Sequence, residues 1–229
     1  MTTTEAVVAE RASRDPVRTR ARILEAATRE FAAKGLEGAR TDEIARSAGI
    51  NKRMIYHYFG SKDALFQAVL EKVYADIRGS EAKLELTSRD PVEAMGQLVS
   101  FSFDWFLGHP EFVKLLNEEN LHLGRHVRRS SAARSLNMPL VEMIGTLLER
   151  GAGSGQFRPG VDPIELYISI AGVSYFYFSN RHTLSAIFGR DLGSDEALER
   201  RRQHAVALIL GYLRADPAVD RSRPAPHSN

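Results

Sequence analysis

The clearest chemical pattern in the sequence is a basic segment, Ile44 to Lys62, that contains no acidic side chain. Its cationic residues are Arg46, Lys52, Arg53 and Lys62, and its further polar donors are Tyr56, His57 and Tyr58. Arginine, lysine and tyrosine side chains, together with backbone N–H groups at helix N-termini, are groups that bind DNA phosphates. A merely solvated basic face normally mixes charges of both signs. The segment therefore indicates contact with duplex DNA.

Local signals place this segment on two short helices. Thr41 can cap a helix over Asp42–Ala48, Gly49 supplies a tight turn, and Asn51 can cap a second helix over Lys52–Tyr58. The inward-facing residues would be Ile44, Ala45, Ala48, Ile55 and Phe59. Two short helices joined by a glycine-containing turn form a helix-turn-helix, whose second helix enters the major groove of DNA.

The run from Thr41 to Leu65 resembles the signature of the TetR family of transcriptional regulators. The features that carry the resemblance are Thr41, Ile44-Ala45, Ala48-Gly49, Tyr56-His57-Tyr58-Phe59 and Ser61-Lys62, in that order. The resemblance implies an all-α homodimer with a small DNA-binding head and a larger helical body. It also implies that a ligand bound in the body weakens DNA binding, so the expected function is a repressor of a palindromic operator. The head alone does not separate a repressor from an activator.

The resemblance also implies roles for individual residues of the basic segment. The positions that enter the groove are matched by Asn51, Lys52, Arg53, Met54 and His57. The positions that hold phosphates are matched by Thr41, Tyr56, Tyr58 and Lys62. Arg53 departs from the small residue often found at its position. Its guanidinium could read guanine O6 and N7, with about 1–3 kcal/mol of discrimination, or it could contact a phosphate.

The composition of the chain is that of a globular protein with one sizeable domain or two small ones. It has 229 residues, of which 43% are hydrophobic and 26% charged, and a net charge of +2. The absence of cysteine excludes disulfides and thiolate metal sites. The polar stretch from Met1 to Asp15 lacks the apolar core of a signal peptide. The most apolar run, Ile164 to Phe178, is too short for a membrane span, so a cytoplasmic protein is expected.

The hydrophobic periodicity is helical along the chain, and no alternating strand pattern occurs, so the sequence predicts an all-α fold. Three Asp-Pro pairs mark helix starts, at Asp15-Pro16, Asp90-Pro91 and Asp162-Pro163. The later helices are predicted over Ser61–Ser80, Val92–Leu107, Glu111–Leu123, Leu136–Arg150, Ile164–Asn180 and Asp195–Arg214. The predicted organisation is a disordered arm at residues 1–15, a helix-turn-helix domain at 16–62, an effector-binding and dimerisation domain at 63–215, and a disordered tail at 216–229.

The helix predicted over residues 164–180 is apolar almost all round, so it must be covered on every side. One body can cover one side, and a twofold-related copy can cover the other. The last helix is amphipathic and could complete a four-helix interface. The residues expected at this dimer interface are Tyr167, Ile168, Ala171, Gly172, Tyr175, Ala205, Leu208 and Ile209.

An effector pocket is expected among the aromatic residues and isolated polar groups of the body. Its apolar walls would come from Phe101, Trp105 and Phe176, and its polar anchors from Asn117, Asn120, His122, Arg125 and Asn180. The alternative is that these aromatic residues are simply core and the polar residues are simply surface.

Two stretches of the body, Glu118–Arg125 and Ser179–Ser185, are similar to a TetR subgroup that includes regulators of pyrimidine utilisation and nicotinate degradation. This similarity implies that the effector is a small planar nitrogen heterocycle or an aromatic acid. Arg125 would be the bidentate partner of an anionic effector, although it could equally be one more surface charge.

Two rival functions compete with this interpretation. His122 and His126 lie four residues apart on a helix, near Glu118 and Glu119, and this spacing can bind a metal ion. Between the histidines there is no glutamate that could act as the base of a metalloprotease, and no hydrolase nucleophile motif occurs, so no metal, cofactor or catalysis is expected. A structural helical protein could use residues 164–178 as an adhesive surface, but that function leaves the basic segment unexplained.

Overall fold

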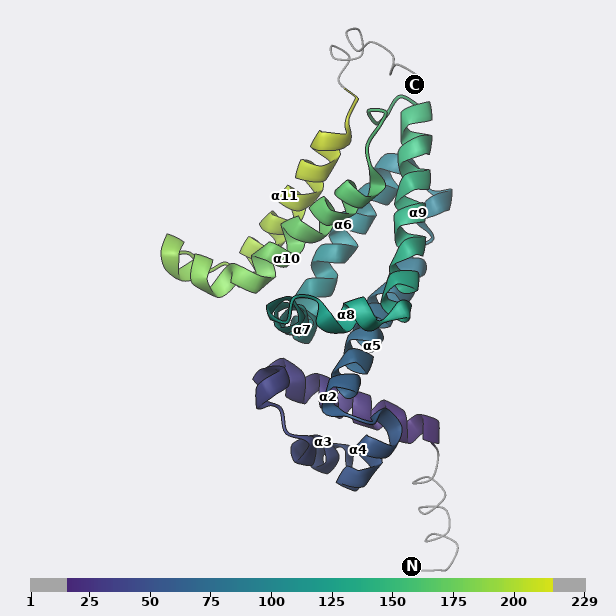
Figure 1. The fold of residues 1–229 in the computed structure, drawn as a ribbon. Coiled ribbons are helices and arrows are strands. Elements are labelled where there is room, and N and C mark those ends of the chain that lie inside the picture. The colour runs from purple at the N-terminus through teal and green to yellow at the C-terminus, as the bar shows by residue number, and fades with distance from the viewer. Residues whose placement is uncertain (1–15, 216–229) are drawn as a thin grey trace, which may run out of the picture. The chain divides into compact units, whose positions relative to one another are not determined.

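The structure is a computed structural model that describes residues 16–215 of the chain, and every regular element in that range is a helix (Figure 1). This confirms the predicted all-α fold. The helices are α2 (Pro16–Gly38), α3 (Thr41–Ala48), α4 (Lys52–Phe59), α5 (Lys62–Ala82), the 3₁₀ helix η1 (Leu86–Ser88), α6 (Pro91–Gly108), α7 (Pro110–Leu121), α8 (Arg125–Arg129), α9 (Ser131–Gly153), α10 (Pro163–Phe188) and α11 (Asp195–Leu213). The predicted arm at 1–15 and tail at 216–229 lie outside the described residues.

The chain divides into two compact units. The first, called the head unit below, contains the residues up to Ile77 together with His109–Leu136. The second, called the body unit, contains Arg78–Gly108 and the residues from Asn137 onward. The head unit is thus larger than the predicted segment 16–62, because most of α5 and the whole of α7 and α8 belong to it, with α7 packed on α2. The sequence did not predict α8.

The core of the head unit forms where α2 packs on α3 and α5. Phe31 and Phe66 are fully buried, and their rings meet edge to face with centroids 5.1 Å apart. Gly35 interrupts α2 with a φ of 69°, a conformation that L side chains rarely adopt, and so turns the last residues of the helix. The predicted end of the first helix at Gly35 therefore appears as this break.

The core of the body unit joins α6, α9, α10 and α11. Aromatic side chains connect α6 to α10, where the rings of Phe103 and Phe178 lie 4.8 Å apart. Asp90 and Asp162 accept hydrogen bonds from the first free backbone N–H groups of α6 and α10, which confirms both predicted caps. None of the described helices is long and apolar enough to span a bilayer.

The helix α10 continues eight residues beyond the end predicted at Asn180. The side-chain amide of Asn180 donates to the carbonyl of Phe176 in its own helix, so it does not compete with the helical backbone. The helix ends instead at Gly189, which has a φ of 60° and provides the left-handed residue that terminates many helices.

Candidate nucleic-acid interface

Helices α3 and α4 have the geometry predicted for a helix-turn-helix. Gly49 closes α3 in the left-handed conformation, with a φ of 62°. The side-chain oxygen of Asn51 accepts a hydrogen bond of 2.9 Å from the backbone N–H of Arg53, which confirms the cap of α4. The predicted cap at Thr41 is wrong, because Arg40 precedes the first turn and Thr41 lies inside the helix. Thr41 is buried, and its hydroxyl lies 3.4 Å from the hydroxyl of Tyr56.

The helix α4 places its apolar and polar residues on opposite faces. Ile55 is fully buried in the core of the head unit, whereas Asn51, Lys52, Arg53, Tyr56 and His57 are exposed. Met54, Tyr58 and Phe59 are half-buried. Phe59 was expected in the core, and it lies instead at the edge of the unit beneath the guanidinium of Arg20, which is 5.2 Å from the ring centroid. The exposed face of α4 is therefore polar and free of acidic residues.

The cationic side chains of this face differ in the partners that they have within the protein. The ammonium of Lys52 lies 3.0 Å from the carboxylate of Asp42, and that of Lys62 donates to the carbonyl of Glu37 at 3.1 Å. The guanidinium of Arg53 has no hydrogen-bond or ion-pair partner among the described residues. Exposed ion pairs contribute little stability, so Lys52 can exchange Asp42 for a phosphate at small cost. Arg53 needs no such exchange.

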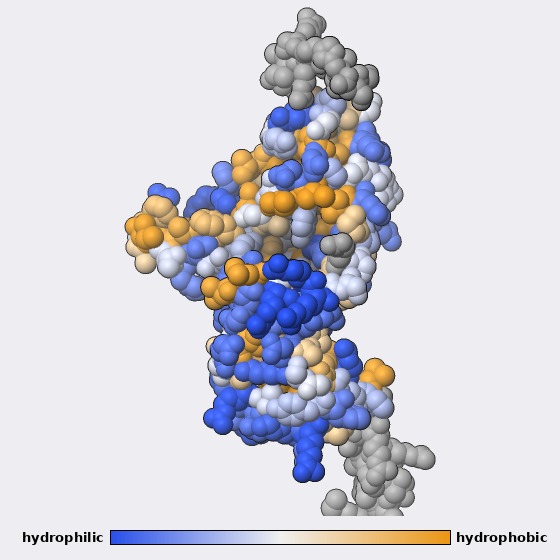
Figure 2. All heavy atoms as spheres, viewed as in Figure 1, coloured by the Kyte–Doolittle hydropathy of each residue, from blue (hydrophilic) through white to orange (hydrophobic). Residues whose placement is uncertain are grey.

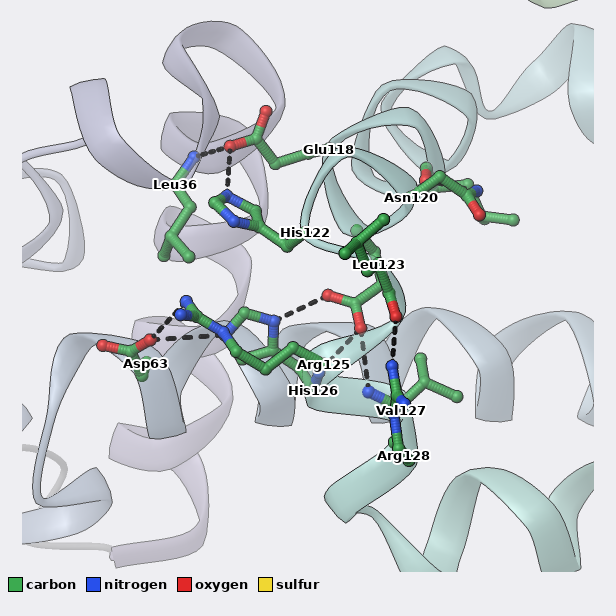
Figure 3. A network of polar contacts seen from close by, with 12 residues as sticks. Leu36, Asp63, Glu118, Asn120, His122, Leu123, Arg125, His126, Val127 and Arg128 are labelled. Carbon is green, nitrogen blue, oxygen red and sulfur yellow. Dashed lines mark hydrogen bonds and ion pairs between the residues drawn. The ribbon is translucent and has the colours of Figure 1, made fainter.

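A buried polar network joins α7 and α8 within the head unit (Figure 3). The Glu119 carboxylate accepts backbone hydrogen bonds from His126 at 2.7 Å and from Val127 at 2.9 Å, at the start of α8. Its other oxygen lies 2.6 Å from Nδ1 of His126. Both side chains are almost completely buried. Glu119 therefore fixes α8 on α7 and orients the histidine ring.

The same histidine connects α8 to the first turn of α5. Nε2 of His126 lies 3.3 Å from Oδ1 of Asp63, and the Arg125 guanidinium donates to the same oxygen at 3.0 Å (Figure 3). The ring of His126 also packs edge to face on Phe66, with centroids 4.9 Å apart. Since α5 directly follows α4, this contact holds the end of the helix-turn-helix against α8.

Glu118, next to Glu119, holds the break in α2. Its Oε1 accepts a hydrogen bond of 2.6 Å from the backbone N–H of Leu36, and it lies 3.3 Å from Nε2 of His122 (Figure 3). A Cβ atom built on Gly35 would lie 2.8 Å from the other Glu118 oxygen. Adjacent carboxylates of α7 thus hold different partners, one the end of α2 and the other the start of α8.

The residues predicted for an effector pocket are divided between the two compact units. Asn117, Asn120, His122 and Arg125 belong to the head unit, and Phe101, Trp105, Phe176 and Asn180 belong to the body unit. His122 and Arg125 belong to the network around Glu118 and Asp63. Phe101 and Trp105 lie side by side on α6, with centroids 5.9 Å apart. Phe176 is 57% exposed and lines an open cavity of about 390 Å³ between the end of α10 and the start of α11.

Sequence inspection missed a buried ion pair in the body unit. Nη1 of Arg78 lies 2.9 Å from Oε2 of Glu81, one helical turn along α5, and the two side chains are 9% and 5% exposed. The guanidinium lies over the ring of Tyr167, 5.6 Å from its centroid. Burial raises the pKa of Glu81 to about 7, and the nearby Arg78 only partly opposes this rise. An i, i+3 pair is common on helix surfaces, so its spacing alone did not reveal burial.

An exposed apolar face runs along α10. Ile164, Ile168 and Phe176 are more than half exposed, and Gly172 lies between them at the same spacing of four. Figure 2 shows apolar residues over α10, including its C-terminal end. Leu208 and Tyr212 add exposed apolar side chains from α11. Of the residues predicted for the dimer interface, Tyr167, Ala171 and Tyr175 are half-buried at the edge of this face, whereas Ala205 and Ile209 belong to the core of the body unit and cannot contact a partner there.

The histidines considered as metal ligands have other partners. The rings of His122 and His126 are 6.0 Å apart and almost perpendicular, and both ring nitrogens of His126 face carboxylates of the head unit. Within residues 16–215 no group of three or more potential ligands is arranged to hold a metal ion.

Comparison with known proteins matches both parts of the chain to one family. Residues 23–69 match the description "Bacterial regulatory proteins, tetR family", and residues 91–209 match "Tetracyclin repressor-like, C-terminal domain". The HTH-type transcriptional repressor NicS of Pseudomonas putida is 44% identical over 180 residues, which cover 79% of this chain and 85% of NicS. The HTH-type transcriptional regulator RutR of Escherichia coli K12 is 25% identical over 84% of this chain and 89% of RutR. The solved structure of the ketosteroid transcriptional regulator KstR2 of Mycobacterium tuberculosis has a TM-score of 0.60 at 23% identity, over 86% of this chain and 95% of that one, which speaks for the fold.

Proposed function

Because this chain belongs to the TetR family, whose members compared above are transcriptional regulators and not enzymes, we propose that it is a dimeric repressor that a small-molecule effector releases from a palindromic operator. The observation that carries this proposal is the exposed face of α4, which offers Arg53 and Lys52 on a capped helix and no acidic residue. As the body's resemblance implies, the effector would be a planar nitrogen heterocycle or an aromatic acid.

Selection of bound sequences from random duplex DNA tests the proposal directly. A dimer with two heads selects an inverted repeat, whose half-sites lie about 34–36 Å apart or at a multiple of that distance. Binding of every sequence with a Kd of only about 10⁻⁴–10⁻⁶ M at physiological salt would instead be non-specific and would contradict the proposal.

We expect Arg53→Ala to weaken binding to the selected operator by about 1–3 kcal/mol, with the loss concentrated at one base pair of each half-site. The reason is that the Arg53 guanidinium has no partner to leave among residues 16–215, and its fork matches O6 and N7 of guanine. The measurement is a titration against operators substituted at each position. Equal losses on all operators would assign Arg53 to a phosphate. Arg18→Ala, a change on the exposed part of α2, serves as the comparison for a general loss of positive charge.

We expect Ile168→Glu to convert the dimer into a monomer at micromolar concentration. The side chain is 55% exposed at the middle of the apolar face of α10, where a second copy would bury the new charge without a partner. Operator affinity should then fall by about 100-fold or more, since the second head no longer binds as part of the same molecule. Sedimentation and operator titration provide the two measurements.

The matched control for this change is Leu121→Glu. Leu121 is 78% exposed on α7 of the head unit, whereas the proposed interface belongs to the body unit. The control variant should stay dimeric. A dimeric Ile168→Glu variant, or a monomeric Leu121→Glu variant, would place the interface elsewhere.

In the proposed release from the operator, α5 connects effector binding to the helix-turn-helix. This helix begins at the contact between Asp63 and α8 and ends in the body unit, so it is common to both units. An effector that binds the DNA-incompetent arrangement more tightly would shift α5, change the separation of the two heads and lower operator affinity. An effector that binds without changing operator affinity would contradict this route.

A further inference from the structure

The Arg78–Glu81 pair contains buried polar atoms that the protein itself does not satisfy. Nε and Nη1 of Arg78 and Oε2 of Glu81 are buried and make no hydrogen bond to any residue of the range 16–215, because the 2.9 Å contact between the two side chains lacks hydrogen-bond geometry. Folded proteins pair nearly all such groups, and an unpaired one is costly. The two groups therefore have unused hydrogen-bonding capacity inside the body unit.

The surroundings of the pair suit a flat molecule. Tyr167 of α10 presents its ring to the guanidinium of Arg78 and packs against the apolar core of the body unit. Ser174 lies two turns further along the same face of α10, about 10 Å away by the rise of a helix. It is fully buried, and its hydroxyl also has no hydrogen-bond partner in the described part of the chain.

We propose that Arg78, Glu81 and Tyr167 form a binding site for a small aromatic carboxylate. A guanidinium binds a carboxylate through charge-assisted hydrogen bonds, and Nε and Nη1 of Arg78, on different edges of its guanidinium, make no hydrogen bond to the described residues. The ring of the ligand would lie against Tyr167, and Glu81 would accept from or donate to a polar group on it. This ligand class would be the effector class of the proposed function. Binding of the ligand does not depend on the proposed function, but its effect on DNA affinity rests on it.

Two other arginine sites fit an anionic ligand less well. Arg125 already pairs with Asp63 in the head unit. The open cavity at the end of α10 is lined by Arg201, whose guanidinium already donates to the carbonyl of Val173 at 3.1 Å, and by Arg200, whose side chain is 68% exposed and lies 2.9 Å from Glu196. Interactions of such solvated charges are weak. A buried guanidinium attracts an anion more strongly, since water does not screen it.

Because Arg78 and Glu81 lie on α5, binding of a ligand to them would affect this helix. A carboxylate that pairs with Arg78 takes the place of Glu81, so the contact between the two side chains must change. Arg78 and Glu81 lie on the last turns of the helix whose first turn holds Asp63 against His126 and Arg125. A displacement along or about the axis of α5 therefore reaches the residue that follows the helix-turn-helix.

The test measures binding of benzoate, with benzamide as its uncharged counterpart, to the full-length protein without DNA. We expect benzoate to raise the melting temperature and benzamide to leave it unchanged. The variant Arg78→Met with Glu81→Leu removes both charges at once, and such replacement of a buried pair is commonly neutral or stabilising, so the variant should fold. Its benzoate affinity by calorimetry should be about 10- to 100-fold weaker than that of the wild type.

The matched control removes an i, i+3 pair of α11, through Glu199→Leu with Arg202→Met. This control should bind benzoate as the wild type does. Equal benzoate binding by the Arg78/Glu81 variant overturns the inference, and so does failure of the wild type to respond up to about 20 mM, tenfold above a weak millimolar Kd. Operator selection uses no benzoate, so failure of this inference is distinguishable from failure of the proposed function.

Discussion

Glu119→Ala should lower the free energy of unfolding by about 3–5 kcal/mol, because each buried donor left without its acceptor costs about 1–3 kcal/mol. The change removes the acceptor of three contacts, two from backbone N–H groups of α8 and one from the ring of His126. It leaves those donors buried without partners, which is more costly than losing the bonds alone. Urea denaturation followed by circular dichroism measures the change.

Glu118→Ala is the matched control, because it removes the neighbouring carboxylate from the same helix. Glu118 is more exposed, with 19% of its side chain accessible, and holds one backbone N–H, that of Leu36. We expect a loss of about 1–2 kcal/mol. If Glu119→Ala cost no more than this control, the buried network would not be what fixes α8.

The helix-turn-helix was predictable because the signals that form it are local. Asn51 caps the helix that follows it, and Gly49 provides the left-handed residue that ends the helix before it. Each needs only its neighbours in sequence. The charge of α4 could also be read directly, since a helix that buries Ile55 must expose the residues on its opposite side. The prediction of Thr41 as the cap was wrong because Arg40 occupies the N-cap position. Arg40 has the extended backbone of a cap residue and makes no side-chain capping hydrogen bond.

The roles of Glu118 and Glu119 could not be read in this way. In sequence they are a pair of acidic residues near two histidines, and the spacing suggests metal binding as readily as structure. Their partners lie far away along the chain, Leu36 for one and the start of α8 for the other. Only the packing of α7 on α2 separates the two roles. The same argument applies to Ala205 and Ile209, whose burial depends on which side of α11 faces the core.

Glu81→Gln should stabilise the protein by about 3 kcal/mol at pH 8 and by less than about 1 kcal/mol at pH 5. The folded state holds the Glu81 proton up to a pH of about 7, whereas the group ordinarily releases it near 4.5. Ionisation therefore works against folding as the pH rises through this interval, and the penalty is complete above it. Glutamine keeps the shape of the protonated acid and never ionises. Urea denaturation at both pH values gives the difference.

The control is Glu196→Gln, which neutralises a carboxylate whose side chain is 86% exposed and should change stability by less than about 0.5 kcal/mol at either pH. A stabilisation by Glu81→Gln that did not grow with pH would mean that Glu81 is not strained by burial.

The expected stabilisation would also bear on function. A buried charge that destabilises the fold and lies beside Arg78, whose Nε and Nη1 make no hydrogen bond to the described residues, indicates a role other than folding. Recognition of a ligand by the pair is such a role, because the buried groups that cost stability in the empty protein are those that a carboxylate would satisfy.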